Sequence, residues 1–161
     1  MSADTAFDLA ELFRAHRPGL VRLAVLLLGD RALAEDVVQD AFVALVRRRP
    51  LDDPAAAGGY LRVSVVNGAR SAQRRAAVRL RHRKAERDDG PPADVEALLG
   101  EEHREVLAAV RRLPRRQREV LVLRYWSGLS EAEIAGTLGV SRGTVKTCAS
   151  RALAKLEGQL R

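Results

Sequence analysis

Apolar residues recur along most of the chain at the three- and four-residue spacing that gathers them on one side of an α-helix. Near the start, this spacing predicts a first helix over 4–16. Pro18 suits the first turn of a second helix over 18–28, and Gly29 ends it. The beginning of the chain is therefore expected to form two successive helices.

A third helix is expected over 30–49, with Asp30 as its cap. Its inward stripe comprises Leu33, Val37, Ala41 and Leu45, widened by Val38 and Phe42. Four polar residues share another face: Glu35, Asp36, Gln39 and Asp40. Periodicity leaves two interpretations of this polar face. It is either solvated surface that complements the helix dipole or a docking face for a basic partner.

Residues 50–59 contain two prolines and a glycine pair, which indicates a loop. A long helix is expected over 60–87, with Leu61, Val65, Ala69 and Ala72 inward. This helix carries nine basic residues and one acidic residue, Arg70, Arg74 and Arg75 among the basic ones. A solvated helix usually mixes its charges, so contact with phosphates is the favoured interpretation. Tyr60 either stacks on a base or packs, and Asn67 either reads a base edge or bonds locally.

An acidic stretch separates this basic helix from the rest of the chain. Residues 88–105 hold seven acidic residues and one basic residue, and they begin with the helix-breaking letters DDGPP. We therefore expect a flexible linker over 88–100 between two small helical domains, 1–87 and 101–161. The predicted fold class is all-α.

Two helices open the second domain, over 101–113 and 114–128. The inward positions of the first are Val106, Leu107, Val110 and Leu113. The second begins at Pro114, and its first turn is crowded with Arg115, Arg116 and Arg118. Cations are unfavourable at that end of a helix dipole, and a nearby phosphate would reverse the cost.

The last two helices have the spacing of a helix-turn-helix. Ser130 and Glu133 form a capping box, Gly139 makes the turn, and Ser141 caps the final helix. Half-burial is the default interpretation of Cys148, with redox switching as the alternative. The outward side of the final helix carries Arg142, Thr144, Lys146, Thr147, Ser150 and Arg151. Its N-terminal residues are expected to enter a DNA major groove.

The amino-acid composition favours some classes of function for this chain and excludes others. The net charge of +7 favours a polyanionic partner, nucleic acid before an anionic membrane. A single Cys excludes an internal disulfide and a Cys-based zinc cluster, and the three His are scattered, so neither metal nor cofactor is expected. The apolar run at 20–29 is too short to span a bilayer, and the N-terminus lacks signal-peptide order. A soluble, cytoplasmic protein is expected.

Three segments in this order resemble bacterial RNA polymerase sigma factors. They are AEDVVQDAFVALVRR, then YLRVSVVNGARSAQRR, then LPRRQREVLVLRYWSGLSEAEIAGTLGVSRGTVKTCASRALAKL. The short two-domain form looks like the extracytoplasmic-function (group 4) class, and within it the SigE-like actinobacterial type. The resemblance covers nearly the whole chain.

The resemblance implies roles for both domains. Residues 1–87 match sigma region 2, so the polar face of Glu35, Asp36, Gln39 and Asp40 would grip the β′ clamp helices of the polymerase. This replaces the solvated-face interpretation. Loop 51–59 and the following helix would recognise the −10 element. The residues expected there are Tyr60, Asn67, Arg70, Arg74 and Arg75.

Residues 101–161 match sigma region 4, which contacts the β flap of the polymerase and reads the −35 element. Its DNA-binding residues would be Arg115, Arg116, Arg142, Thr144, Lys146, Thr147, Ser150 and Arg151. The linker would run near the RNA exit path, although a plain tether has the same composition. The resemblance also implies a monomer within the holoenzyme, no membrane insertion, and an anti-sigma partner.

Departures from the family pattern and competing functions remain. Cys148 stands where many relatives carry a basic or polar residue, and loop 51–59 lacks an obvious base-capturing aromatic. A free-standing repressor or activator would dimerise on a palindrome, yet no dimerisation helix is evident. A nucleic-acid enzyme would need a metal or phosphate motif that this sequence lacks. The sequence therefore predicts a sigma factor and not an enzyme.

Overall fold

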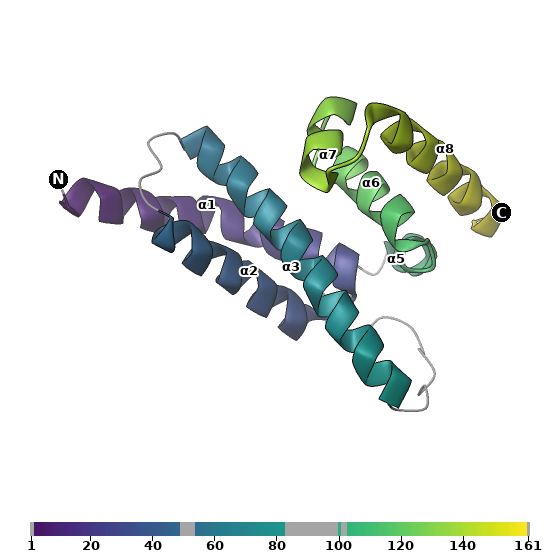
Figure 1. The fold of residues 1–161 in the computed structure, drawn as a ribbon, viewed down its shortest axis with the longest axis horizontal. Helices are drawn as coiled ribbons and strands as arrows, with labels where there is room; N and C mark the ends of the chain where they lie inside the picture. Colours follow the sequence, from purple (N-terminus) through teal and green to yellow (C-terminus); the bar gives the residue numbers. More distant parts are fainter. Residues whose placement is uncertain (1, 49–53, 83–99, 101–102, 161) are drawn as a thin grey trace.

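The computed structural model describes residues 2–48, 54–82, 100 and 103–160, with side chains described for 9–48, 56–79, 100 and 103–160. Every regular element in these ranges is a helix, which confirms the all-α prediction. Figure 1 shows two groups of helices side by side, an N-terminal bundle and a C-terminal unit. The predicted linker over 88–100 lies, apart from Gly100, outside the described residues.

The N-terminal bundle consists of α1 (Ser2–Leu28), α2 (Arg31–Arg47) and α3 (Pro54–His82). The second half of α1 is almost wholly apolar and lies in the core, where Ala24 and Val25 are completely buried. Asp30 caps α2 through a 3.1 Å bond from the Leu33 backbone N–H to its carboxylate. The predicted stripe of α2 is buried except for Leu33, which is partly buried against the core.

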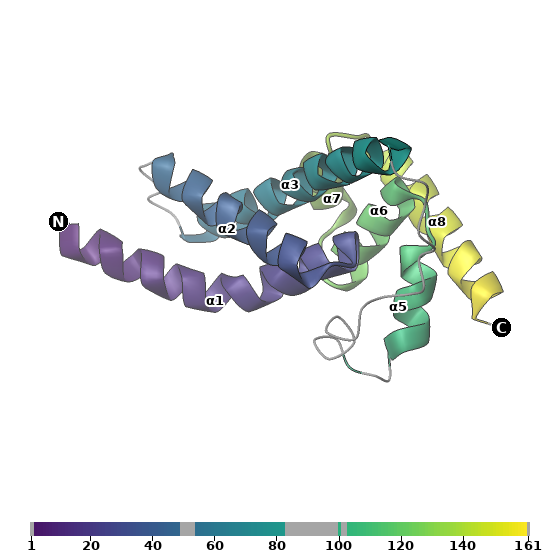
Figure 2. The same ribbon diagram turned by 90° about the horizontal axis from the view of Figure 1, so that it is seen from below.

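The prediction of two helices before Gly29 is wrong, because α1 runs through Pro18. A proline removes one backbone donor and bends a helix, and Figure 2 shows α1 as a bent rod. Pro18 and Gly19 are exposed, so the carbonyl that loses its partner lies on the solvent side. Packing of the apolar residues that follow, from Leu20 onward, keeps the helix continuous.

The predicted loop at 50–59 is wrong in its second half, because α3 begins at Pro54. Proline at the first helical position needs no donor, and the alanines that follow are strong helix formers. Ala57 is buried, so this turn also gains from packing. Residues 49–53 lie outside the described part of the chain. Tyr60 is thus well inside α3 and not at its start.

The C-terminal unit consists of α5 (Arg104–Arg111), α6 (Arg115–Tyr125), α7 (Glu131–Leu138) and α8 (Arg142–Gln159). Ser130 and Ser141 cap α7 and α8, each accepting a 3.1 Å bond from a backbone N–H three residues later. Gly139 ends α7 with a φ of 67°, a left-handed conformation that favours glycine. The predicted helix-turn-helix is therefore confirmed in its caps and its turn.

One residue predicted to face inward, Val106, is exposed, and so is the aromatic residue Phe13 of α1. Phe13 is 42% exposed and leans on Phe42, with 4.9 Å between the ring centroids. Val106 is 43% exposed because it lies on the outer side of the short helix α5, whereas Leu107 and Val110 are buried. Helical spacing alone does not say how wide the buried stripe of a helix is.

The bundle and the C-terminal unit pack against each other. Their buried apolar residues form one continuous cluster. Helix α1 contacts α5 and α6, while α3 contacts α7. The arrangement is closed, with the C-terminal unit lying along one side of the bundle in both views (Figures 1 and 2).

Candidate polymerase and nucleic-acid interfaces

The polar face of α2 is open to solvent. Asp36, Gln39 and Asp40 are exposed, and Glu35 is half-buried in a 3.2 Å ion pair with Arg31. The buried stripe of α2 holds this face rigidly outward. One contact with α3 is especially close, because a Cβ added at Gly68 would lie 2.9 Å from the Cγ1 atom of Val37. Three of the four predicted polymerase-binding side chains are thus exposed together on one rigid helix.

The predicted −10 residues on α3 have different surroundings. Asn67, Arg74 and Arg75 are exposed. Tyr60 is half-buried, and the guanidinium of Arg48 lies 4.9 Å from its ring centroid. This contact occupies a face of the Tyr60 ring. The geometry therefore favours the packing interpretation of Tyr60 in this conformation.

The predicted −35 residues on α8 form one exposed row: Arg142, Thr144, Lys146, Thr147, Ser150 and Arg151. The buried side of α8 contains Val145, Ala149 and Ala152, which hold the row toward solvent. Lys146 Nζ lies 3.9 Å from a carboxylate oxygen of Glu131, a loose surface pair. Cys148 is half-buried, in agreement with the default interpretation of its position.

Arg70 and Arg115 were assigned to different DNA sites, yet both meet one buried carboxylate, that of Glu119. The Arg70 guanidinium donates from Nε and Nη2 to the same Glu119 oxygen, at 3.1 Å and 2.7 Å. Arg115 Nε lies 3.3 Å from the other oxygen, and Arg116 Nη1 lies 3.6 Å from the first. The Glu119 side chain is only 3% exposed. We call this group the Glu119 cluster.

Sequence reasoning missed Glu119. The available signal was its position four residues after Arg115 and three after Arg116, the spacing at which helical side chains form ion pairs. The expected cost of cations in the first turn of α6 is therefore offset by a carboxylate of the same helix. The contribution of Arg70 had no sequence signal, because α3 and α6 are far apart along the chain.

The positive charge around the Glu119 cluster is not fully compensated. Burial lowers the pKa of Arg118, and the neighbouring charges of Arg111 and Arg115 lower it further against the opposing effect of Glu119. Within the described part of the chain, Arg118 Nε and Gln117 Oε1 are buried without a hydrogen-bond partner. Unsatisfied buried polar atoms make a contact surface less stable.

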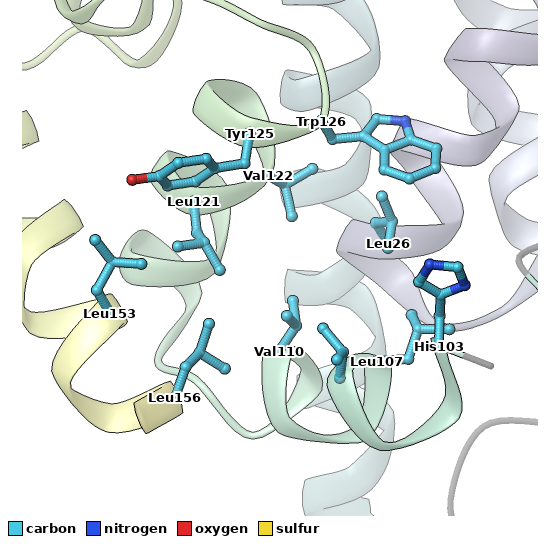
Figure 3. A pocket seen from close by; sticks show the side chains of 11 residues that line it. Leu26, His103, Leu107, Val110, Leu121, Val122, Tyr125, Trp126, Leu153 and Leu156 are labelled. Atoms are coloured by element: carbon cyan, nitrogen blue, oxygen red, sulfur yellow. The ribbon is translucent and has the colours of Figure 1, made fainter. Parts of the chain in front are cut away.

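A second feature is an apolar pocket of about 360 Å³ with mostly hydrophobic walls. Figure 3 shows Tyr125 and Trp126 at one rim, Leu153 and Leu156 at a second, and Leu26 at a third. Tyr125 is 60% exposed and Trp126 is 48% exposed. Exposed aromatic residues around an apolar cavity are typical of protein-binding surfaces.

The described residues contain no group of His, Cys, Asp and Glu able to hold a metal ion. No helix in the described ranges combines the length and the apolar character needed to cross a bilayer.

Comparisons with known proteins agree on one family. The sequence profile of sigma-70 region 2 matches residues 12–87, and that of sigma-70 region 4 matches residues 103–156. The chain is 32% identical over 154 residues to the RNA polymerase sigma-E factor of Streptomyces coelicolor, covering 95% of this chain and 86% of the relative. It is 36% identical over 152 residues to the ECF RNA polymerase sigma factor SigM of Mycobacterium tuberculosis, covering 94% and 75%.

Solved structures have the same fold. The sigma factor RpoE of Bartonella quintana, in complex with the anti-sigma factor NepR, superposes with a TM-score of 0.71 at 22% identity, covering 98% of this chain and 96% of that one. The structure of CnrH in complex with the cytosolic domain of CnrY gives a TM-score of 0.64 at 26% identity, covering 94% of this chain and 86% of that one. The chain belongs to the sigma-70 family of RNA polymerase sigma factors, in its extracytoplasmic-function class.

Proposed function

We propose that this sigma factor binds core RNA polymerase through the exposed acidic face of α2 and directs it to promoters with distinct −10 and −35 elements. In this proposal residues 1–87 act as region 2, 88–100 as the linker and 101–161 as region 4. The protein acts in the cytoplasm, as a monomer within the holoenzyme, and has no catalytic activity of its own. An anti-sigma factor holds it inactive, a proposal supported by the complex of the sigma factor RpoE with the anti-sigma factor NepR.

The main support for the proposed polymerase contact is that Asp36, Gln39 and Asp40 are exposed on a helix whose other side is buried. Complementary charge raises association rates and gives specificity, so an acidic face fits a basic polymerase surface. The β′ clamp helices are the proposed partner.

For DNA, the proposal uses the exposed row of α8 and the basic face of α3. The N-terminal part of α8 is free to enter a major groove, where Arg151 and its neighbours would contact bases or phosphates of the −35 element. Asn67, Arg74 and Arg75 would contact the −10 element.

For the second polymerase contact, the apolar pocket between α5, α6 and α8 is the proposed receptor of the β flap. Its exposed Tyr125 and Trp126 are the kind of side chain that dominates binding energy at interfaces.

The experiment that tests the proposal is gel filtration with bacterial core RNA polymerase. We expect co-elution at a one-to-one ratio, and loss of co-elution in the double variant Asp36→Lys, Asp40→Lys. Glu11→Lys is the matched control, since Glu11 is an exposed helical acid on α1. Separate elution of the wild type, with the free protein running as a dimer, would favour an autonomous helix-turn-helix repressor or activator.

A further inference from the structure

We infer that α8 recognises thymine in the −35 element through the methyl groups of Thr144 and Thr147, and not through their hydroxyl groups. This inference rests on the proposed function, which places α8 in the major groove of that element. It adds the chemical class of the base that these two side chains contact. Among the four bases, thymine alone presents an apolar group, its C5-methyl, in the major groove.

The hydroxyl groups of both threonines are engaged within α8 and its cap. Thr147 Oγ1 donates to the carbonyl oxygen of Gly143 at 3.0 Å. Thr144 Oγ1 and Ser141 Oγ are 2.9 Å apart, and the same Ser141 oxygen accepts the backbone N–H of Thr144 at 3.1 Å. Helical threonines often bond in this way to groups one turn earlier. The methyl group of each side chain is then the part that remains for an outside partner.

Both threonines lie on the exposed side of α8, about one helical turn apart. Val145 and Ala149 are buried and fix the rotation of the helix, so that Thr144 and Thr147 face solvent together. Three residues of an α-helix advance about 4.5 Å along its axis. Successive base pairs are separated by about 3.4 Å. The two methyl groups therefore suit thymines at adjacent base pairs.

The surroundings of the two threonines suit an apolar contact. Cys148, one turn after Thr144, is a small side chain and is half-buried. Lys146 Nζ lies 3.9 Å from a carboxylate oxygen of Glu131, so the cation next to Thr147 is attracted toward α7. The methyl groups thus form a small apolar strip, Thr144 and Thr147, within a row that is otherwise polar or basic.

A contact through the hydroxyl groups would have a different signature. A hydroxyl group both donates and accepts hydrogen bonds, so it can pair with groups of any base. Such a contact would need no methyl group on the base or on the side chain. A contact between methyl groups needs both of them, and removing either one should have the same effect as removing both.

The first experiment identifies the thymines. The full-length protein, assembled with bacterial core RNA polymerase, selects its promoters from a library of random-sequence duplexes. We expect the enriched −35 elements to carry thymine at two adjacent base pairs. Each thymine is then replaced by deoxyuridine, which lacks only the C5-methyl group. The affinity of the holoenzyme should fall by about fourfold at each contacted thymine, the effect of losing one buried methyl group.

The second experiment assigns each thymine to a side chain. Thr147→Ser removes the methyl group and keeps the hydroxyl, whereas Thr147→Val keeps a methyl group and removes the hydroxyl. Thr147→Val should keep the preference for thymine over deoxyuridine at both positions, and Thr147→Ser should lose it at one. Thr144→Ser should lose it at the other. Circular dichroism checks that each variant is folded.

The matched control is Thr137→Ser on α7. The Thr137 hydroxyl also donates to a carbonyl oxygen one turn earlier, that of Glu133 at 2.8 Å, but Thr137 lies outside the exposed row of α8. This variant loses the same methyl group from the same kind of site. It should keep the full preference for thymine at both positions.

Two results would overturn the inference. One is equal binding of deoxyuridine and thymine at every position of the −35 element. The other is loss of the preference in Thr147→Val together with its retention in Thr147→Ser, because the hydroxyl group would then be the contact. A failure of the proposed function looks different: no −35 element would be enriched from the library, and the inference would fall with it.

Discussion

At the scale of single residues, Glu119 shows how one side chain changes the role of its neighbours. Three arginines from two helices converge on its carboxylate: Arg115 and Arg116 pair with it within α6, and Arg70 reaches it from α3. A buried carboxylate without these partners would be very costly, and the arginines without it would repel one another.

Replacing Glu119 by Ala should lower the free energy of unfolding by about 2 to 3 kcal/mol, the low end for a buried ion pair because Arg115 and Arg116 reach solvent. Urea denaturation measures this change. Glu105→Ala, an exposed acid in the first turn of α5, should lower it by less than about 1 kcal/mol. Equal losses in both variants would show that the cluster is not specially stabilising.

Replacing Arg151 by Ala should lower transcription selectively from promoters that carry the cognate −35 sequence, since a good base contact contributes about 1–3 kcal/mol of discrimination. In vitro transcription from promoters with intact and altered −35 elements provides the comparison. An equal loss on every promoter would identify Arg151 as a phosphate contact instead.

At the scale of elements, the helix ends that are set by a cap or a glycine followed from the sequence, whereas the start of α3 at Pro54 and the continuity of α1 through Pro18 did not. Asp30, Ser130, Ser141 and Gly139 act through contacts within a few residues, and all four were predicted correctly. Pro18 misled the prediction because its effect depends on which side of α1 faces solvent. The Arg70–Glu119 pair was unpredictable in the same sense, because it exists only once α3 and α6 meet.

The turn of the helix-turn-helix offers a paired test with opposite signs. Gly139→Ala should destabilise the protein by about 1 kcal/mol, because its φ of 67° is unfavourable for a residue with a Cβ. An added Cβ would meet no neighbouring atom, so no steric clash adds to this cost. Gly136→Ala, in the exposed interior of α7 and also in open space, should stabilise it by roughly 0.5–1 kcal/mol. Thermal denaturation of both variants checks the pair; destabilisation by Gly136→Ala would contradict it.

At the scale of the whole molecule, the two halves share a continuous apolar core as well as the Arg70–Glu119 ion pair. Trp126, the single tryptophan of the chain, lies at the pocket together with Leu26 of the N-terminal bundle. It is 48% exposed in the closed form and belongs to the C-terminal unit, so its surroundings report separation of the halves.

Opening should therefore shift the fluorescence emission of Trp126 to longer wavelength, because water replaces the apolar wall that Leu26 provides. We expect this shift in Arg70→Ala relative to the wild type, because this variant loses the ion pair that joins α3 to α6. Arg79→Ala, which removes an exposed arginine of the same helix, serves as the control and should leave the emission unchanged. An unchanged spectrum in Arg70→Ala would mean that Leu26 stays in place.

The position of Leu26 has a thermodynamic consequence for competition between partners. A partner that fills the pocket and touches Leu26 along with α5, α6 and α8 binds the closed form more tightly than the open one. By thermodynamic reciprocity, closing raises the affinity for that partner by a certain factor, and the bound partner raises the equilibrium constant for closing by the same factor. A partner of this kind and any other partner that needs the two halves apart would then oppose each other through one shared equilibrium, even where their contact residues do not overlap.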